Sequence, residues 1–509
     1  MSDSPRLSGS TGSSRVPGSP GSSDLPGSPA DPSRHETHAT PADRTARAAR
    51  TARAARAVRA AQAARAAIVG AGPAGSLLAI LLARRGHPVD VYDMRPDPRD
   101  GKGDGEGRSI NLGLSARGIR ALRHVGLWNA LGDRLVPMRG RMIHRPGRPT
   151  AFQAYGTDPG EILYSVSRDE LTTLLVERAA EHGEVRHLFG VRCAGVDRES
   201  GDLTLADAIT GETRDARADF VVGADGAFSA VRAAMQRGLA ADYRQEFLEW
   251  GYKELTIPAA PGGGSRVPLE ALHVWPGENA LIVAHPNVDG SLTATLFLPH
   301  SGAPGFAELD GERDVTRFFL RVFPGMVDLV PDLAAQYAAN PVGNLVTIRT
   351  SRWRHADRVV LAGDAAHAVY PFYGQGMNSA LEDCLMLDGC LARHPGDRAA
   401  AFGEYQRLRK PHTDILADLS EQNFADLRDG TRSPLRLARR QADLALNRAF
   451  PTLWRPLYTM VSHTDMPYGE ALRRAHRQDR VLRWSGAALA AGAALAAVRI
   501  TSSPRRTSP

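Results

Sequence analysis

The sequence predicts an α/β fold with an inserted, mostly antiparallel β-sheet and a C-terminal helical region. A short apolar run at residues 67–69 leads directly into a glycine-rich turn and an apolar helical run at 76–85. Two later segments, 218–232 and 358–384, repeat this order of buried strand, turn and helix. Between them, residues 273–299 alternate apolar and polar side chains around turn residues, which indicates antiparallel strands.

The glycine-rich turn, GAGPAG, contains Gly70, Gly72 and Gly75 in the GxGxxG spacing. Gly70 allows the tight turn, Gly72 lets the backbone approach a pyrophosphate, and Gly75 lets helix and strand pack closely. The N-terminus of the following helix offers free amides and a positive potential to phosphates. The next strand ends at Asp93, 23 residues after Gly70, where an acid can accept hydrogen bonds from an adenosine ribose. This unit predicts a Rossmann-like dinucleotide site.

The two later segments favour FAD as that dinucleotide. The first has an Asp-Gly turn after its strand, and the second ends its strand in Gly-Asp, where the carboxylate can accept hydrogen bonds from a ribityl chain. The helix after the second segment could direct its N-terminal amides at a flavin's pyrimidine edge, which gains negative charge on reduction. The predicted cofactor residues in these segments are Asp225, Gly363, Asp364, Gly376, Met377 and Asn378.

The positive charge of this 509-residue chain is concentrated at its two ends. The chain carries 63 Lys and Arg against 56 Asp and Glu, a net charge of +7. The first 66 residues hold ten arginines and five acids, and three more arginines follow residue 498, so residues 67–498 carry a net charge of −1. A nearly neutral folded region argues against nucleic-acid binding as the main function.

The cysteines and the two ends of the chain indicate where in the cell the protein is expected. Cys193, Cys384 and Cys390 are too few for a disulfide framework and lack metal-ligand spacing, so we expect a cytoplasmic protein without a metal site. Residues 1–66 form a Ser/Gly/Pro-rich and then Arg/Ala-rich tail, whose first part we expect to be disordered. The Ala-rich run at 486–498 is shorter than the ~20 residues of a membrane-spanning helix, so we expect at most weak membrane association.

The expected domains follow from these segments. A flavin-binding domain carries the three strand–turn–helix units, an inserted β-sheet domain covers the site, and helices cap it. The boundaries are 1–66 for the tail, 67–245 with 341–400 for the flavin domain, 246–340 for the substrate sheet, 401–485 for the capping helices and 486–509 for the Ala-rich helix and basic end.

The motifs together resemble those of the FAD-dependent aromatic hydroxylases, the single-component flavoprotein monooxygenases. Further blocks over about residues 66–475 are similar to the kynurenine 3-monooxygenase family, among them RSINL (108–112), MRGRM (138–142), SVSRDEL (165–171), GYKEL (251–255) and PFYGQGMNSALEDC (371–384). The resemblance implies bound FAD, transient NADPH and O₂, with L-kynurenine hydroxylated at ring carbon 3 through a flavin C4a-hydroperoxide.

The resemblance also implies site residues. Arg141 and Tyr155 match the pair that grips the substrate carboxylate, a role that suits a guanidinium and a directional hydroxyl. The remaining matches are Arg108 and Arg168 beside the flavin, Asn423 and Tyr458 on the substrate, and Phe372, Tyr373 and Gln375 as catalytic-loop residues that border flavin and ring.

Two alternatives remain open on the sequence. The same chemistry could act on a ring-substituted kynurenine or another aromatic amino acid, or the chain could be a non-oxygenating FAD-binding redox or interaction protein. One departure from the family concerns Asp93, Met94 and Arg95, where the family more often has Glu followed directly by Arg. The adenosine contact of that arginine is therefore an open question.

Overall fold

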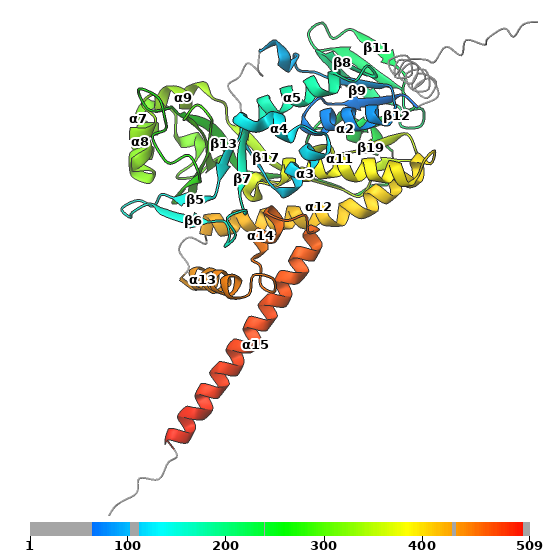
Figure 1. The fold of residues 1–509 in the computed structure, drawn as a ribbon. Coiled ribbons are helices and arrows are strands. Elements are labelled where there is room, and N and C mark those ends of the chain that lie inside the picture. The colour runs from blue at the N-terminus through cyan, green and yellow to red at the C-terminus, as the bar shows by residue number, and fades with distance from the viewer. Residues whose placement is uncertain (1–63, 102–110, 239, 430–433, 502–509) are drawn as a thin grey trace, which may run out of the picture. The chain divides into compact units, whose positions relative to one another are not determined.

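The computed structural model describes residues 64–101, 111–238, 240–429 and 434–501 (Figure 1). The predicted tail therefore lies almost wholly outside the described residues, and so does Arg108. The α/β fold class is confirmed, because parallel and antiparallel sheets alternate with helices along the chain and helices follow residue 398.

A six-stranded sheet forms the centre of the flavin domain. Its strands run parallel except for the first, which pairs antiparallel to its neighbour. In spatial order they are β18 (Arg354–His355), β19 (Val359–Leu361), β12 (Phe220–Gly223), β1 (Ala66–Val69), β2 (Val89–Asp93) and β8 (Val185–Phe189). All three predicted strand–turn–helix units therefore supply adjacent strands, because β19, β12 and β1 lie side by side.

Helices and two small antiparallel sheets complete this domain. Long apolar helices pack on the central sheet, and Leu77, Leu78 and Ile80 of the first are fully buried. The helices are α2 (Pro73–Arg84), α3 (Ala116–His124), α4 (Trp128–Leu131), α5 (Arg168–Ala180), α6 (Ala230–Gln236), α10 (Asp364–His367) and α11 (Gly376–Arg393), with the 3₁₀ turns η1 (Pro98–Asp100), η2 (Gly132–Arg134) and η4 (Pro371–Tyr373). The small sheets are β9 (Val191–Val196), β10 (Leu203–Asp207) and β11 (Thr213–Ala216), and β3 (Asn111–Leu114), β7 (Leu163–Ser167) and β4 (Val136–Met138).

The second large sheet has seven strands and is antiparallel except where β14 meets β5. It takes three strands from outside the predicted segment 246–340, namely β5, β6 and β17. In spatial order the strands are β17 (Gly343–Thr350), β13 (Tyr243–Ile257), β16 (Leu292–Pro299), β15 (Ala280–Pro286), β14 (Leu272–Gly277), β5 (Gly140–Ile143) and β6 (Ala151–Ala154).

The two faces of this sheet bury different side chains, as the alternation of the strands requires. Ile282 and Ala284 of β15 pack on the face covered by η3 (Phe306–Glu308), α7 (Glu312–Val322), α8 (Pro324–Leu329) and α9 (Leu333–Ala339) (Figure 1). Leu281 and Val283 lie on the opposite face, beside aromatic side chains of η4 and α12. That second face is the wall of the candidate site.

In the described part of the C-terminal region the helices are α12 (Arg398–Asp429), α13 (Pro434–Ala449), α14 (Leu457–Ser462) and α15 (Tyr468–Thr501). The predicted Ala-rich helix is the last part of α15. Across the described ranges, no helix combines the length and the apolar character needed to cross a membrane.

Candidate active site

The glycine-rich turn between β1 and α2 has the geometry that its spacing predicts. Gly70 has φ +103°, and a Cβ on Gly75 would lie 1.8 Å from the Gly70 carbonyl oxygen, so helix and strand pack too closely for a side chain there. A Cβ on Gly72 would meet no atom within 4 Å. The backbone at Gly72 thus borders open space at the N-terminus of α2, which suits an approaching pyrophosphate.

Asp93 forms hydrogen bonds both with the glycine-rich turn and with Arg95. Its carboxylate accepts hydrogen bonds from the Ala71 amide at 2.7 Å and from the Arg95 guanidinium at 3.0 and 2.9 Å. Burial alone would raise the pKa of Asp93, but the contacts with Arg95 outweigh it and hold the pKa below its ordinary value. The inserted Met94 is exposed, so the extra residue loops outward and Arg95 still lies against the acid. The Asp93–ribose contact stays a prediction.

The Gly-Asp segment that follows β19 presents an exposed carboxylate. Gly363 has φ +60°, which favours glycine, and its amide donates to Asp383 at 3.0 Å. The side chain of Asp364 is solvent-accessible, yet desolvation by the surrounding protein raises its pKa, and the charge of Arg168 acts in the opposite direction. An accessible but poorly solvated carboxylate near an arginine fits a polar group of a bound cofactor.

Two predicted cofactor residues mainly organise the backbone. Asp225 accepts hydrogen bonds from the amides of Ala230 and Val231 and so holds the start of α6. Asn378 accepts from the Ser115 amide and donates to the Gly113 and Gly374 carbonyls. Both side chains position loops at the predicted flavin site; their contact with FAD stays a prediction.

Gln375 and Met377 lie in the same loop and helix start. The Ser115 hydroxyl donates to the Gln375 side-chain carbonyl at 3.2 Å, which ties the 371–378 loop to the segment after β3. Met377 packs partly buried against the flavin-domain core, and Gly376 is the first residue of α11. An open glycine turn, a charged acid beside it and an exposed Asp364 on which the charge of Arg168 acts together fit an FAD molecule.

A buried ion-pair network lies behind the Gly-Asp segment. Arg409 of α12 pairs with Asp383 and Glu382, each at 2.6 Å, and Glu382 also pairs with Arg117 of α3 at 3.3 Å. His367 contacts Asp383 at 2.5 Å. All five side chains are at most 8% exposed. Every buried charge in this network therefore has an opposite charge beside it.

Arg141 of β5, which is partly buried, has a different environment. Its guanidinium carbon lies 4.6 Å from the ring centre of Tyr458 and 5.8 Å from that of Tyr155. Within the described residues no carboxylate forms an ion pair with it, and its Nε atom is buried without a hydrogen-bond partner. Burial alone would lower the pKa of Arg141, but Tyr458 and Tyr155 raise it instead, so the cation is maintained.

Three tyrosines and a histidine surround this arginine. Tyr155 and Tyr458 stack with ring centres 5.7 Å apart, and Tyr373 lies 5.7 Å from Tyr458. The Tyr155 hydroxyl is buried without a partner, and burial raises the pKa of both Tyr155 and Tyr373. We call Arg141, Tyr155, Tyr373, Tyr458 and His463 the tyrosine–arginine cluster. It contains three of the four predicted substrate-binding residues.

His463 was missed in the sequence. Its ring centre lies 5.4 Å from that of Tyr155 and 6.2 Å from that of Tyr458, and its buried Nε2 has no hydrogen-bond partner. Desolvation, reinforced by the charge of Arg141, lowers the pKa of His463 to about 4. The only signal in the sequence was its position, five residues after Tyr458, just past the end of a short helix.

The two arginines of the MRGRM segment, Arg139 and Arg141, lie in different environments. Arg139 pairs with Glu270 at 3.1 Å, and both side chains are about half exposed or more, at 49% and 65%. Arg141, two residues later, is partly buried and contacts the rings of Tyr155 and Tyr458, whereas Arg139 lies just before β5 begins.

An aromatic wall adjoins the cluster. Phe372 of η4 lies 4.6 Å from Phe424 and 5.2 Å from Phe297 between ring centres, and Trp250 meets Phe424 edge-on at 5.1 Å. Asn423 donates from Nδ2 to the Phe372 carbonyl at 2.6 Å. The fourth predicted substrate residue thus holds the catalytic loop in this structure, and its contact with substrate stays a prediction.

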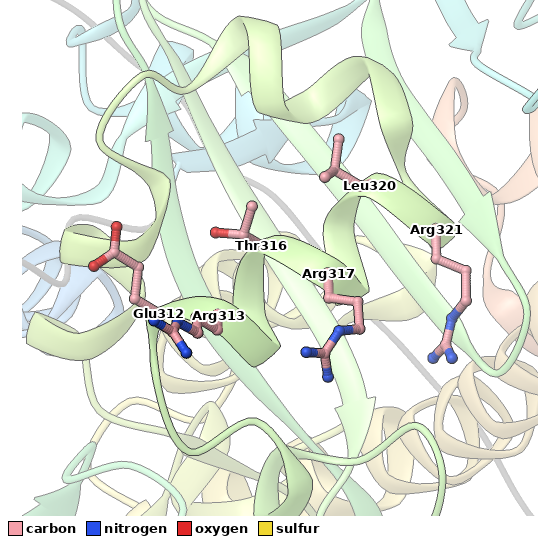
Figure 2. Close-up of a pocket in the computed structure, with 6 residues that line it drawn as sticks. All are labelled: Glu312, Arg313, Thr316, Arg317, Leu320 and Arg321. Atoms are coloured by element: carbon pink, nitrogen blue, oxygen red, sulfur yellow. The ribbon is translucent and has the colours of Figure 1, made fainter.

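A hollow of about 780 Å³ lies elsewhere, along the outer face of α7 (Figure 2). Its lining comes from one helix, and arginines dominate it. The residues are Glu312, Arg313, Thr316, Arg317, Leu320 and Arg321. No predicted site residue borders this surface, so it is not the candidate active site.

Known proteins match both the fold and the sequence. The FAD binding domain family matches residues 63–279 and 342–419. The tetrameric form of 2-methyl-3-hydroxypyridine-5-carboxylic acid oxygenase has a TM-score of 0.57 at 21% identity, covering 74% of this chain and 95% of that one. PqsL of Pseudomonas aeruginosa, in complex with 2-aminobenzoylacetate, has a TM-score of 0.59 at 23% identity, covering 72% and 98%. Fold and glycine turn therefore define a flavoprotein of the FAD-dependent monooxygenase class.

Curated relatives narrow the class. A kynurenine 3-monooxygenase from Salinispora tropica is 56% identical over 86% of this chain and 97% of the relative. Another from Myxococcus xanthus is 42% identical over 82% of this chain and 89% of the relative. The chain belongs to the kynurenine 3-monooxygenase family of enzymes.

Proposed function

We propose that this enzyme hydroxylates L-kynurenine at ring carbon 3, with bound FAD, NADPH as reductant and O₂ as oxidant. The observation that carries the proposal is Arg141, a partly buried cation without a carboxylate partner in the described chain, beside an aromatic wall. A cation that is partly withdrawn from water is stabilised by an opposite charge beside it, so an anionic ligand is the expected partner. An aromatic amino acid offers a carboxylate and a ring in one molecule.

The tyrosine–arginine cluster binds the carboxylate in this proposal. Arg141 can donate two parallel hydrogen bonds to a carboxylate, and the hydroxyls of Tyr155 and Tyr458 add directional donors. The aromatic ring then lies against Phe372 and Phe424, which exclude water from it. Fixing one end of the substrate on β5 and α14 orients the other end, and orientation is a large part of the rate enhancement.

The loop between η4 and α11 lies between the aromatic wall and the proposed flavin site in this proposal. Bound FAD supplies the reduction and oxygen chemistry that the side chains themselves lack. Gly72, Asp93, Arg168 and Asp364 are the residues that would hold it. Ser115 and Asn378 fix the loop that carries Phe372 and Tyr373, so ring wall and flavin site share one support.

The proposal includes a cytoplasmic setting. Cys193, Cys384 and Cys390 are free and buried in the structure. Burial raises the pKa of all three thiols, to about 11 for Cys193 and Cys390, so none is poised to form a thiolate.

The test is an NADPH oxidation assay on the FAD-loaded enzyme, with product analysis. L-Kynurenine should accelerate NADPH loss and yield 3-hydroxykynurenine. No acceleration and no hydroxylated product would refute the proposed substrate. A faster reaction with a ring-substituted kynurenine than with L-kynurenine would assign the enzyme to that alternative. FAD binding without any substrate-dependent oxidation would favour the non-oxygenating alternative.

A further inference from the structure

His463 is the one member of the tyrosine–arginine cluster to which the proposed function assigns no role. The cluster's other groups suit an anion: a guanidinium and the hydroxyls of Tyr155, Tyr373 and Tyr458. An α-amino acid also carries an ammonium group next to its carboxylate. A protonated amine needs an acceptor, and in the described part of the cluster the imidazole nitrogen of His463 can act as one, beside the tyrosine hydroxyl oxygens, which the proposed function assigns to the carboxylate.

The structure fixes the histidine firmly in place. The Arg117 guanidinium donates to the Thr464 carbonyl at 3.0 Å and also to the carbonyls of Val461 and Met466. These carbonyls flank His463 on both sides. Because Arg117 is fully buried and paired with Glu382, the segment that carries the imidazole is anchored to the flavin domain.

The protonation state of the imidazole suits an acceptor. Arg141 is positive and desolvation disfavours a second cation beside it, so His463 is neutral at physiological pH. A neutral imidazole has one N–H and one acceptor nitrogen. Its buried Nε2 lacks a partner among the described residues, and an unsatisfied buried polar atom costs about 1–3 kcal/mol. A ligand that supplies the missing partner recovers that free energy.

We propose that His463 is a substrate-positioning residue that accepts a hydrogen bond from the α-ammonium group and selects α-amino acids over acids that lack the amine. This inference rests on the proposed function. It assigns the carboxylate to Arg141 and the ammonium to the imidazole, so the two charges of the zwitterion are recognised by different segments, β5 and the residue that follows α14.

The experiment measures the Kd of two ligands by calorimetry on FAD-loaded enzyme: L-kynurenine and its des-amino analogue, 3-(2-aminobenzoyl)propanoate. His463→Phe should weaken L-kynurenine binding about tenfold and leave the analogue within about twofold. His463→Gln retains an acceptor and should keep most of the discrimination. His187→Phe is the matched control, because His187 also has a pKa lowered to about 4 by burial but lies in β8 of the flavin domain.

The outcomes separate the two claims. Equal losses for both ligands, or no loss for either, would overturn the ammonium contact while leaving the substrate assignment intact. Wild-type enzyme that binds neither ligand would refute the proposed substrate, and the inference with it. If His463→Phe does not retain FAD, the Kd values of the two ligands for His463→Gln decide. If flavin absorbance shows that His463→Gln retains FAD and this variant no longer discriminates between the two ligands, the acceptor role is contradicted.

Discussion

Two arginines of this enzyme, one buried and one partly buried, differ in their charge partners. Arg409, in the ion-pair network, lies 2.6 Å from each of two carboxylates of its own chain. Arg141, in the tyrosine–arginine cluster, has tyrosines around it and no carboxylate among the described residues. A charge that is paired within its own chain contributes to the fold, whereas a cation without an opposite charge beside it is a candidate for ligand binding. The contrast supports the proposed carboxylate site at Arg141.

The two regions are also physically connected. Arg117 belongs to the network through Glu382, and it donates to the carbonyls that flank His463. The network therefore supports the α14 end of the cluster. Damage to the network should reach the substrate site, while damage to the cluster should leave the network intact.

The largest expected effect is on the network. Arg409→Leu leaves Glu382 and Asp383 without their shared cation, which should lower the free energy of unfolding by about 3–5 kcal/mol. Urea unfolding followed by circular dichroism measures it. A loss below about 1 kcal/mol would mean that the network is not structural, and the comparison would fail on that side.

The next effect is on the cluster. Arg141→Ala should weaken L-kynurenine binding about 10- to 100-fold, because hydrogen bonds to a charged group are lost, while FAD content and urea midpoint stay close to wild type. Arg139→Ala is the matched control: its partner is an exposed glutamate, so the Kd should change less than about twofold. Loss of FAD from Arg141→Ala would show that the arginine is misassigned.

A smaller effect is expected from the phenols. Tyr458→Phe keeps the ring that lies over Arg141 and removes only the hydroxyl, so the Kd should rise about 2- to 10-fold. The kcat at saturating substrate should change little if the hydroxyl contributes to binding alone. An unchanged Kd would exclude this hydroxyl from the carboxylate site.

The pH dependence of stability should differ between the regions. The pKa of His463 is lowered to about 4, so its neutral form stabilises the fold above its ordinary pKa of 6.5 and that contribution is lost as the pH falls from about 6.5 towards 4. Burial would raise the pKa of Asp383, but His367 and Arg409 lower it, so its contribution is lost only below about pH 3.8. Urea midpoints between pH 7.5 and 5 should fall less in His463→Phe than in wild type. Parallel curves for the two proteins would contradict this.

Much of the flavin domain could be predicted from the sequence. The glycine turn, the Asp-Gly turn and the Gly-Asp strand end are local patterns, so adjacent strands β1, β12 and β19 could be predicted with their turns. The inserted sheet was only partly accessible, because β5, β6 and β17 join it from distant segments and their pairing is a tertiary contact.

In the candidate site, too, residues in local motifs could be predicted from the sequence, and residues brought in by tertiary contacts could not. Arg141, Tyr155 and Tyr458 were predicted from motifs, and the structure brings them together. His463 has no motif, because its significance arises only when the end of α14 packs against Tyr155. The sequence also gave no sign that Asp93 would hold Arg95 across an inserted methionine, or that Asn423 would donate to the catalytic loop.

The most direct test of the central claim uses L-kynurenine and its decarboxylated amine in wild-type enzyme and in Arg141→Ala. If Arg141 is unpaired in order to bind a carboxylate, wild type should bind L-kynurenine at least about tenfold more tightly than the amine, and the variant should bind the two alike. Equal discrimination by both proteins would contradict the claim, because the carboxylate would then be recognised elsewhere.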